Sequence, residues 1–594
     1  MDRRSLLKAG LATGALTLPA GRQLLACPAI FRRARPGQAG WPSHSEWKKL
    51  SGDVGGRLIR PVSPLKACAA KAGDCEALFR QIRNPYLIRD DAALTQSLGW
   101  VDAWVSEPSA YAVAAESAHH IAAAVRFAAR HKLRLVVKGG GHSYQGTSNA
   151  PDSLLVWTRK LTDIQLHDSF TPKGCAQSEG PAVSLGAGCI WQEAYTAVTT
   201  NGGRYVQGGG CSTVGVAGLV SSGGFGTYSK GFGTAAASLI EAEVVTADGR
   251  IRTVNRCNDP ELLWALKGGG GSTFGVITRL TLRTYALPAE AGVVNADIKA
   301  ADTAAFTRLI ELAMNFCGRR LLTPHWGEQI IFRPKNLMQI RTEFQGISRA
   351  EAAAIWSDFF AEVRSDPQLS MAEVTIISAP MRKAWDPEFL GTIPDTIARD
   401  NRASAAAGNI YWAGDAGQVA QFVHGYASIW LPSRLLGAEP QARLVEALAR
   451  AASIWKVSLH LNKGLAGATP EVIAAARETA TNPAVLDAFA LAILGAEEEP
   501  AYPGIADHEP HVAKGRSDAA HVRLAAAPLR ALLKAPASYV SESDYFERDW
   551  KSAFWGPNYA RLARIKQRYD PEGLFFAHHM VGSDQWSTDG FTRT

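Results

Sequence analysis

The 594-residue chain lacks the long apolar runs that mark a membrane-spanning protein. Beyond the N-terminal leader, no stretch reaches the roughly 18 uninterrupted apolar residues that a spanning helix requires. Metal-ligand spacing is also missing. His119 and His120 are adjacent in a segment of helical composition, so they point about 100° apart, and no third ligand has a suitable spacing. The sequence therefore predicts neither a transmembrane helix nor a metal site.

A strong charge of one sign is absent from most of the chain. The formal net charge is +8, but residues 1–35 hold seven Lys or Arg and one acid, a balance of +6, which leaves +2 for the rest. That remainder contains no basic stripe interleaved with aromatic residues. With 46% hydrophobic and 20% charged residues, we expect an ordinary globular protein without a nucleic-acid partner.

The basic N-terminus has a pattern of its own. Arg3 and Arg4 precede a mild apolar run at 9–20, which is the order of a twin-arginine export signal; a chance basic end on a short amphipathic helix is the alternative. Twin-arginine export is bacterial and moves folded proteins, so a leader at 1–35 predicts a bacterial protein that is periplasmic or secreted. A sequence resembling a lipobox ends at Cys27, which is a candidate lipid anchor.

Cysteine is scarce, with eight residues in the chain. An exported protein permits disulfides, and setting aside Cys27 and Cys211 leaves six cysteines, for which about fifteen connectivities exist. The sequence does not choose among them, and free buried thiols are the alternative. The one pairing that we predict joins Cys68 to Cys75, which lie close together in an Ala-, Lys- and Gly-rich stretch.

Two glycine-rich turns are the most informative features that are present. The first, Lys138–Gly146, follows the apolar strand Leu133–Val137 and places His142 directly after three glycines; the second, Gln207–Gly218, does the same for Cys211. Bare glycine backbone can take positive φ and aim its N–H groups at an anion, which is how such turns hold phosphates. An ordinary tightly packed loop is the alternative for either turn alone.

Together the two turns resemble the berberine-bridge-enzyme-like family of FAD-linked oxidases, within the fold group typified by vanillyl-alcohol oxidase. In that family a Gly-Gly-His-Ser-Tyr turn carries a histidine bonded to the 8α-methyl of FAD, and a Gly-x-Cys-x-Thr-Val-Gly turn carries a cysteine bonded to ring carbon 6. The resemblance implies bicovalent FAD on His142 and Cys211. It also implies cofactor contacts at Lys138, Gly139, Gly140, Gly141, Ser143, Tyr144, Gly210, Thr213, Val214, Gly215, Gly218 and Val276.

The resemblance covers nearly the whole chain after about residue 60. It implies an α+β, two-domain FAD-binding fold whose substrate domain is an antiparallel sheet backed by helices. We expect the FAD-binding domain at 60–288, the substrate domain at 289–544, and a C-terminal segment at 545–594 that returns to the FAD-binding domain. Within that segment, Trp555–Phe575 resembles the C-terminal signature of the family.

Local patterns predict several elements. Ser117–His131 has the composition of a helix, and Asp248-Gly249 marks a hairpin. A helix at Leu262–Lys267 precedes a third glycine run, Gly268–Gly271, and a strand follows; a Rossmann fingerprint needs strand, glycines and helix in that order, so it is excluded.

In the second half, Trp455–Asn462 alternates strictly between apolar and polar residues. The polar row either lines the substrate cavity or is the wet face of a sheet, and nearby aromatic residues either form a pocket or pack. The polar row is Lys456, Ser458, His460 and Asn462. The aromatic residues are Tyr411, Trp412, His424, Tyr426 and Trp430.

A base is expected just before the C-terminal segment. Ser538–Asp544 resembles the family segment Tyr-x-Asn-Tyr-x-Asp, whose second tyrosine is catalytic in several members, and Glu542 occupies that position here. A glutamate made less acidic by an apolar pocket can act as a base, and a solvated acidic turn is the alternative. Strand alternation predicts that Glu542 and Asp544 point together and that Tyr539, the next candidate, points oppositely unless the chain turns.

These features favour an oxidase that removes hydride from the C–H bond of a small alcohol or sugar-like substrate and passes two electrons to dioxygen. In the family, a valine three residues after the bonded cysteine goes with oxidase behaviour, and Val214 holds that position. A dehydrogenase with another acceptor is one rival. A flavin-carrying binding or electron-shuttle protein without turnover is a second, and sugars, aromatic alcohols and polyketide-like alcohols all stay open as substrates.

Overall fold

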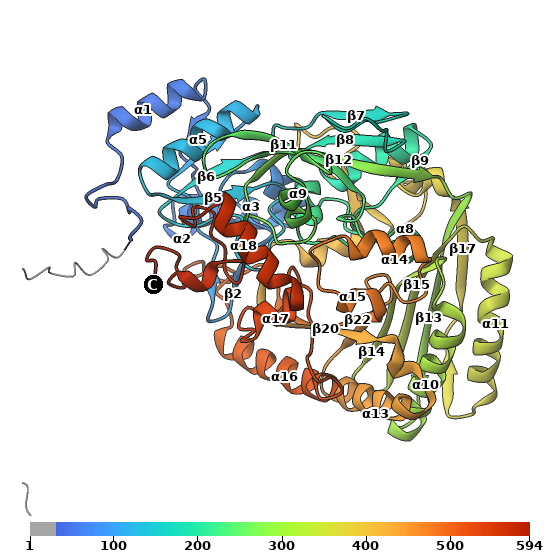
Figure 1. Ribbon diagram of the computed structural model, residues 1–594. Coiled ribbons are helices and arrows are strands. Elements are labelled where there is room, and N and C mark those ends of the chain that lie inside the picture. Colours follow the sequence, from blue (N-terminus) through green and yellow to red (C-terminus); the bar gives the residue numbers. More distant parts are fainter. Residues whose placement is uncertain (1–30) are drawn as a thin grey trace, which may run out of the picture.

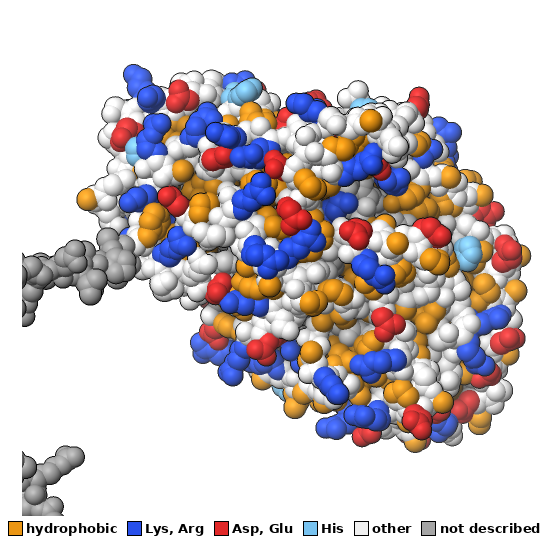
Figure 2. Space-filling model, in the orientation of Figure 1, with side chains coloured by type: hydrophobic (Ala, Val, Ile, Leu, Met, Phe, Trp, Pro, Cys, Tyr) orange, Lys and Arg blue, Asp and Glu red, His pale blue; other side chains and the backbone are white. Residues whose placement is uncertain are grey.

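The computed structural model describes residues 31–594, so Arg3, Arg4, Cys27 and all of the leader predicted at 1–35 except residues 31–35 lie outside the described residues (Figure 1). The fold is α+β, as predicted, and is built on three main sheets. Within 31–594 no helix combines the length and apolar character needed to cross a membrane. On the face shown in Figure 2, basic and acidic side chains are interspersed over most of the surface.

The strand before the first glycine turn lies in a small four-stranded sheet whose last three strands run parallel. The helix α5 (Ala118–Arg130) covers it and buries its apolar stripe. Ser117 caps α5 by accepting a hydrogen bond from the backbone N–H of His120, and the helix ends before His131, so the predicted helix is confirmed. In spatial order the strands are β1 (Leu58–Ile59), β4 (Tyr111–Ala114), β6 (Ser153–Trp157) and β5 (Arg134–Lys138).

A six-stranded antiparallel sheet lies along the top of the view in Figure 1. The Asp248-Gly249 turn joins two of its strands, which confirms the predicted hairpin. The helix α9 (Pro260–Leu266) ends before the third glycine run and a strand follows, in the predicted order. The strands are β11 (Ile251–Asn255), β10 (Leu239–Val245), β12 (Val276–Ala286), β8 (Ala182–Gly186) and β7 (Ile164–His167), with β9 (Arg204–Val206) on β12.

A ten-stranded sheet forms the other half of the molecule, and four long helices back one of its faces (Figure 1). The helices are α10 (Thr303–Phe316), α11 (Arg349–Ser365), α13 (Ala438–Ile454) and α16 (Val512–Arg530). The strands are, in order, β16 (Leu369–Met371), β13 (Glu290–Ala300), β15 (Leu337–Gln345), β14 (Trp326–Arg333), β21 (Val457–His460), β22 (Ala488–Glu498), β20 (Gln421–Pro432), β2 (Ser97–Trp100) and β3 (Trp104–Val105), with β17 (Thr375–Pro380) on β13.

The sheet also takes in a strand from far upstream. Because β2 pairs in parallel with β20, a segment that precedes the first glycine turn is part of the large sheet. The boundaries expected near residues 60, 288 and 544 stay predictions.

The C-terminal segment packs against the half of the molecule that carries the glycine turns. It contains α17 (Trp550–Trp555) and α18 (Tyr559–Tyr569). Arg561 pairs with Glu261 of α9 at 2.5 Å, and the Tyr569 hydroxyl donates to Asp259 at 2.9 Å. Farther on, Phe575 forms a bridge to β5. The last helix therefore lies against α9, and the chain after it reaches the strand that leads into the first glycine turn.

Two disulfides join four of the cysteines in the described part of the chain. The predicted Cys68–Cys75 pair is confirmed, and a second bond joins Cys175 to Cys257. Within residues 31–594, the free cysteines are Cys189, Cys211 and Cys317. The second bond spans 82 residues, so nothing local in the sequence indicated it.

Candidate active site

A cavity of about 940 Å³ lies where the two glycine turns meet the ten-stranded sheet. This volume is near the upper end of the roughly 300–1,000 Å³ that ligand sites occupy. The expected catalytic residues Tyr539 and Glu542 line it, and so do all of the expected cofactor residues except Lys138. The structure thus brings together residues that are up to about 400 positions apart in the chain.

Bare backbone is required where the two turns touch. A Cβ atom added to Gly140 would lie 2.7 Å from the backbone nitrogen of Gly215, and a Cβ on Gly215 would lie 2.7 Å from that of Gly140. Real Cβ atoms do not approach so closely, so the two turns pack backbone against backbone only because both positions are glycine. Gly141 has a φ of +81°, which also favours glycine.

His142 follows the first turn and is held by the second. Its Nε2 atom lies 3.2 Å from the Thr213 hydroxyl, within hydrogen-bonding distance. Burial lowers the pKa of His142 to about 4, so the ring is neutral at neutral pH. A neutral imidazole with one nitrogen facing Thr213 keeps the other ring nitrogen for a further partner.

Cys211 faces an acid that the sequence did not single out. Asp415 lies in a short 3₁₀ helix, η4 (Ala413–Gln418), and lines the same cavity as Cys211. The Asp415 charge, together with burial, raises the thiol pKa well above its usual value. Next to η4, the Trp412 indole N–H donates to the carbonyl of Gly210 at 3.0 Å, which fixes this segment against the second turn.

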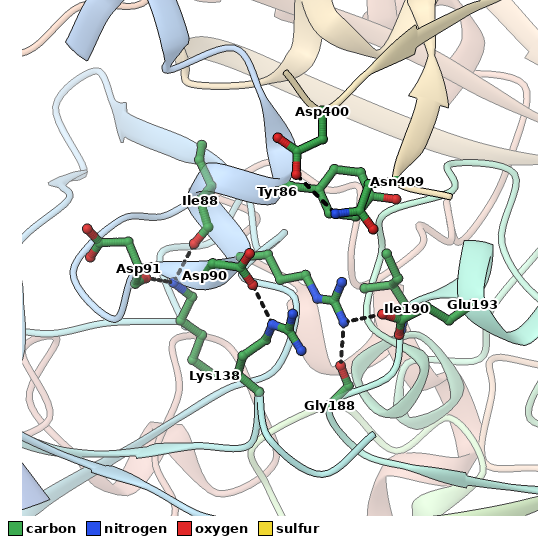
Figure 3. Close-up of polar contacts among 12 residues, drawn as sticks. Tyr86, Ile88, Asp90, Asp91, Lys138, Gly188, Ile190, Glu193, Asp400 and Asn409 are labelled. Atoms are coloured by element: carbon green, nitrogen blue, oxygen red, sulfur yellow. Dashed lines mark hydrogen bonds and ion pairs between the residues drawn. The ribbon is translucent and has the colours of Figure 1, made fainter. Parts of the chain in front are cut away.

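Lys138 was expected to contact the cofactor, and the structure places its side chain elsewhere. Its ammonium donates to the backbone carbonyls of Ile88, Asp91 and Leu94, and the side chain is fully buried (Figure 3). Burial lowers its pKa to about 7. The side chain therefore binds the end of α4 (Pro85–Asp90) and the segment that follows it, and Lys138 does not line the cavity.

The polar row of the alternating strand lines the cavity, which decides between the two alternatives. Its polar residues Lys456, Ser458, His460 and Asn462 face the cavity. The other face packs in the core under the helices, with Val457, Leu459 and Leu461 fully buried. The physical reason is that successive side chains of a strand point to opposite faces of the sheet, so one row faces the helices and the other row faces the cavity.

The aromatic residues of the second half divide between the two expectations. Trp412 and Tyr426 line the cavity, whereas Tyr411 packs near Tyr86 and Trp430 is part of the buried core. His424 is buried, and its Nδ1 atom lies 2.8 Å from a carboxylate oxygen of Asp518 on α16. The sequence alone could not separate these roles, because each aromatic residue lies in an apolar stretch.

Glu542 lies in a turn and not in a strand, which corrects the expected alternation. Its backbone N–H donates to the carbonyl of Tyr539 at 3.0 Å, so both side chains reach the cavity while Asp544 does not line it. The partner of Glu542 is the Lys463 ammonium, and the apolar pocket expected around this carboxylate is replaced by an ion pair. Burial raises the pKa of Tyr539, so its phenol is protonated at neutral pH.

Two further acids lie in the cavity and were missed. Glu328 accepts hydrogen bonds from Thr227 at 2.8 Å and from Asn462 at 3.0 Å, and its φ of +60° breaks the alternation of β14. Strict alternation of side chains along β14 would have placed Glu328 on the core side of the sheet. Beside it, burial and the Glu328 charge raise the pKa of Glu343 to about 8.

The residues present fit a dinucleotide cofactor better than a metal. Both glycine turns expose backbone to the cavity, and a Cβ on Gly218 would meet no atom within 4 Å, so the cavity is open beside the second turn. Two turns that expose their N–H groups in this way suit phosphates, and the neutral His142 and the thiol of Cys211 face the same space. Among residues 31–594, no group of three His, Cys, Asp or Glu side chains is placed to hold a metal ion.

Comparisons with known proteins agree with this geometry. The family model described as FAD binding domain matches residues 109–255, and the model described as berberine and berberine like matches residues 538–582. The chain is 31% identical over 496 residues to the FAD-linked oxidoreductase easE of Arthroderma benhamiae, covering 81% of this chain and 90% of that protein.

Two solved structures show the same fold. The VAO-type flavoprotein MtVAO615 of Myceliophthora thermophila matches with a TM-score of 0.76 and 23% identity, covering 95% of this chain and 100% of that one. The glucooligosaccharide oxidase of Acremonium strictum, which carries a 6-S-cysteinyl, 8α-N1-histidyl FAD, matches with a TM-score of 0.65 and 16% identity, covering 88% and 99%.

Proposed function

The chain belongs to the berberine-bridge-enzyme-like family of FAD-linked oxidoreductases, and we propose that it is an oxidase that takes hydride from an alcohol or sugar-like C–H bond and reduces dioxygen to peroxide. One observation carries the proposal: the two glycine turns and the Glu542 carboxylate line the same cavity. FAD supplies the hydride-accepting and oxygen chemistry when it is bound. The residues of the chain hold the cofactor, orient the substrate and accept its proton.

FAD is attached at two points in this proposal, through His142 and Cys211. The neutral imidazole of His142 presents one nitrogen to Thr213 and has the other available for a bond. Cys211 lies in the matching position on the second turn and lines the same cavity. The double attachment in the glucooligosaccharide oxidase of Acremonium strictum supports the same arrangement here.

Glu542 is the base in this proposal. A hydroxyl group loses its proton more easily when a positioned carboxylate accepts it as the hydride leaves. The Lys463 ammonium fixes the orientation of the Glu542 carboxylate, whereas the protonated phenol of Tyr539 is a poor proton acceptor. The polar row with Ser458 and His460 lines the same cavity and offers hydrogen bonds to substrate hydroxyls, which supports a sugar-like substrate.

The proposal also includes the cellular location of the protein, which rests on the leader. Arg3 and Arg4 head a twin-arginine signal, so the protein is bacterial, is exported folded with its flavin in place, and works in the periplasm or outside the cell. Cys27 is then the candidate attachment point for a lipid anchor. These statements rest on the sequence of residues 1–35.

A substrate screen tests the proposed reaction. Purified yellow protein is mixed without air with sugars, aromatic alcohols and polyketide-like alcohols, and the flavin absorbance is followed before air is admitted. A true substrate should bleach the flavin, and air should restore the colour with release of peroxide. Bleaching followed by slow recovery in air indicates a dehydrogenase with another acceptor. A flavin that none of these alcohols bleaches contradicts the proposed substrate class.

A further inference from the structure

The short helix η4 contacts both glycine turns, one at each end. Before η4 begins, the Trp412 indole donates to Gly210, the residue that precedes Cys211, at 3.0 Å. At its other end, the hydroxyl of Tyr144, two residues after His142, donates to the side-chain oxygen of Gln418 at 3.1 Å. The helix therefore has a defined position relative to both expected attachment points, and Asp415 lies between its two contacts.

The segment that leads to η4 is anchored to the rest of the molecule by buried polar contacts. Arg402 bonds to Asp400 and Asp90 at 2.8 Å each, and the Asn84 amide donates to Asp400 at 2.7 Å. Asp400 lies beside Tyr86 above the Asp90 region in Figure 3. The fixed segment leads into η4 and so gives Asp415 a defined position in the cavity that Cys211 lines, as a positioned proton acceptor requires.

The Cys211 thiol needs such an acceptor. A thiolate is the nucleophile in cysteine chemistry, and both the Asp415 charge and burial hold the pKa of this thiol well above its usual value. Very little thiolate therefore exists at neutral pH. The Lys463 ammonium acts in the opposite direction but does not reverse the shift. Bond formation at Cys211 then requires that the proton leave as the sulfur reacts.

Asp415 has the properties of that acceptor. Burial raises its pKa to about 6, which leaves it mostly ionised at neutral pH and makes it a stronger base than an ordinary aspartate. Its Oδ2 atom is buried and has no hydrogen-bond partner among the described residues. An ionised oxygen without a partner, whose charge is the largest influence on the pKa of the Cys211 thiol, is suited to take the thiol proton.

We propose that Asp415 is the base that removes the thiol proton of Cys211 when the sulfur bonds to the flavin. The inference rests on the double attachment proposed above. In the overall step, the S–H bond and one ring C–H bond break and one S–C bond forms. The thiol proton passes to Asp415, and the two electrons released by the oxidation pass through the flavin to dioxygen. Together with two protons they give one hydrogen peroxide for each bond formed.

The test follows the state of Cys211 and not turnover. Wild-type protein and the Asp415→Asn variant are purified, denatured in acid, alkylated and digested, and the Cys211 and His142 peptides are measured by mass spectrometry. Wild type should give one product in which both peptides are joined through FAD. Asp415→Asn should give FAD on the His142 peptide and an alkylated, flavin-free Cys211 peptide. In this variant, the bond between Cys211 and FAD should form in air about a hundredfold more slowly than it does in freshly synthesised wild-type protein.

A matched control and a rescue separate the base from a merely structural role. Glu497 is another carboxylate that lines the cavity, and Glu497→Gln should keep both bonds. Asp415→Ala leaves space for a small acid, so added formate should speed the second bond in that variant but not in wild type. If Asp415→Asn does not fold, Asp415→Ala provides the test of the role of Asp415.

The outcomes distinguish the two proposals. Double attachment in Asp415→Asn at the wild-type rate overturns the role of Asp415 and leaves the bicovalent cofactor intact. A free Cys211 in the wild-type protein overturns the bicovalent cofactor itself, and this inference fails with it. Loss of the Cys211 bond in Glu497→Gln as well would show that any lost cavity charge has this effect, which also overturns the specific role of Asp415.

Discussion

The Nε2 atom of His142 lies 3.2 Å from the hydroxyl of Thr213, so one hydrogen bond links the two glycine turns across 71 residues of sequence. Backbone packing of Gly140 on Gly215 supports the same contact. Because Thr213 is two residues from Cys211, the position of the histidine ring and the position of the thiol are set by one local arrangement. The two expected attachment points therefore form a single structural unit.

The first prediction concerns this unit. Acid-precipitated wild-type protein should be yellow, and so should His142→Ala and Cys211→Ala, because each variant keeps one bond to the flavin. The double variant should lose its colour in acid, as measured by the absorbance of the pellet and supernatant. A colourless wild-type pellet would contradict covalent attachment, and a colourless pellet in one single variant would show that only the substituted residue is bonded.

A second prediction concerns the base. Glu542→Gln should slow anaerobic flavin reduction by about a hundredfold or more, which is the usual scale for a general base. Flavin content and reoxidation in air should not change, and stopped-flow absorbance measures all three. The comparison is Tyr539→Phe, which removes a phenol that burial keeps protonated and should have a smaller effect. If Tyr539→Phe is the slower variant, the assignment moves to Tyr539.

Oxygen reactivity gives a third prediction. Val214 lines the cavity, and a larger side chain at this position should hinder the approach of dioxygen. Val214→Ile should therefore slow reoxidation of the reduced flavin while the rate of reduction by substrate is kept. Oxygen-dependent recovery of the absorbance, with peroxide measured alongside, checks the result. Equal reoxidation in both proteins would mean that Val214 does not control access.

Acid stability gives a fourth prediction. Burial alone would raise the pKa of Asp400, but hydrogen bonds from Arg402, Asn84 and Asn409 outweigh it and hold the pKa well below the usual value. A depressed folded-state pKa contributes stability that is present above about pH 4 and is lost as pH falls through the folded-state pKa. Asp400→Asn should lower the unfolding free energy by about 3 kcal/mol at neutral pH.

Denaturant unfolding between pH 7 and pH 3 measures this effect. The difference between wild type and Asp400→Asn should shrink as the pH falls, because the wild-type protein loses the contribution of the ionised carboxylate. Asp358→Asn is the control, since Asp358 is an exposed aspartate on α11 and should give a difference near zero at every pH. A pH-independent difference for Asp400→Asn would contradict the linkage.

Export gives the fifth prediction. Replacing Arg3 and Arg4 by Lys keeps the charge but removes the planar guanidinium groups. Folded, flavin-containing precursor should then accumulate inside the cell, as shown by fractionation and flavin fluorescence. An unchanged periplasmic yield would argue against a twin-arginine route.

Local features of the sequence were the most predictable. The helix before β5, the Asp248-Gly249 hairpin and the polar row with Ser458 all follow from periodicity or turn chemistry within a few residues. Backbone geometry explains two failures. A turn replaces the expected strand at Glu542, and a positive φ at Glu328 moves that side chain to the cavity face.

Contacts between distant segments could not be predicted from one sequence. Asp415 and Cys211 are more than 200 residues apart, and nothing near Asp415 indicates a thiol partner. Lys138 illustrates the converse, since it borders the first glycine turn, yet its side chain is bonded to carbonyls of residues 88–94. Adjacency in sequence predicted the location of the backbone but not the direction of the side chain.

The parallel pairing of β2 with β20 also limits how early the large sheet can fold during synthesis. Residues 97–100 cannot pair in this sheet until residues 421–432 have been synthesised. At about 5–20 residues per second, synthesis of the intervening chain takes tens of seconds. The wall of the cavity that carries Tyr426 does not exist before then, so FAD cannot be enclosed until residues 421–432 have been made. A fragment that stops at residue 288 leaves β2 paired only with β3 and should expose its other edge to aggregation.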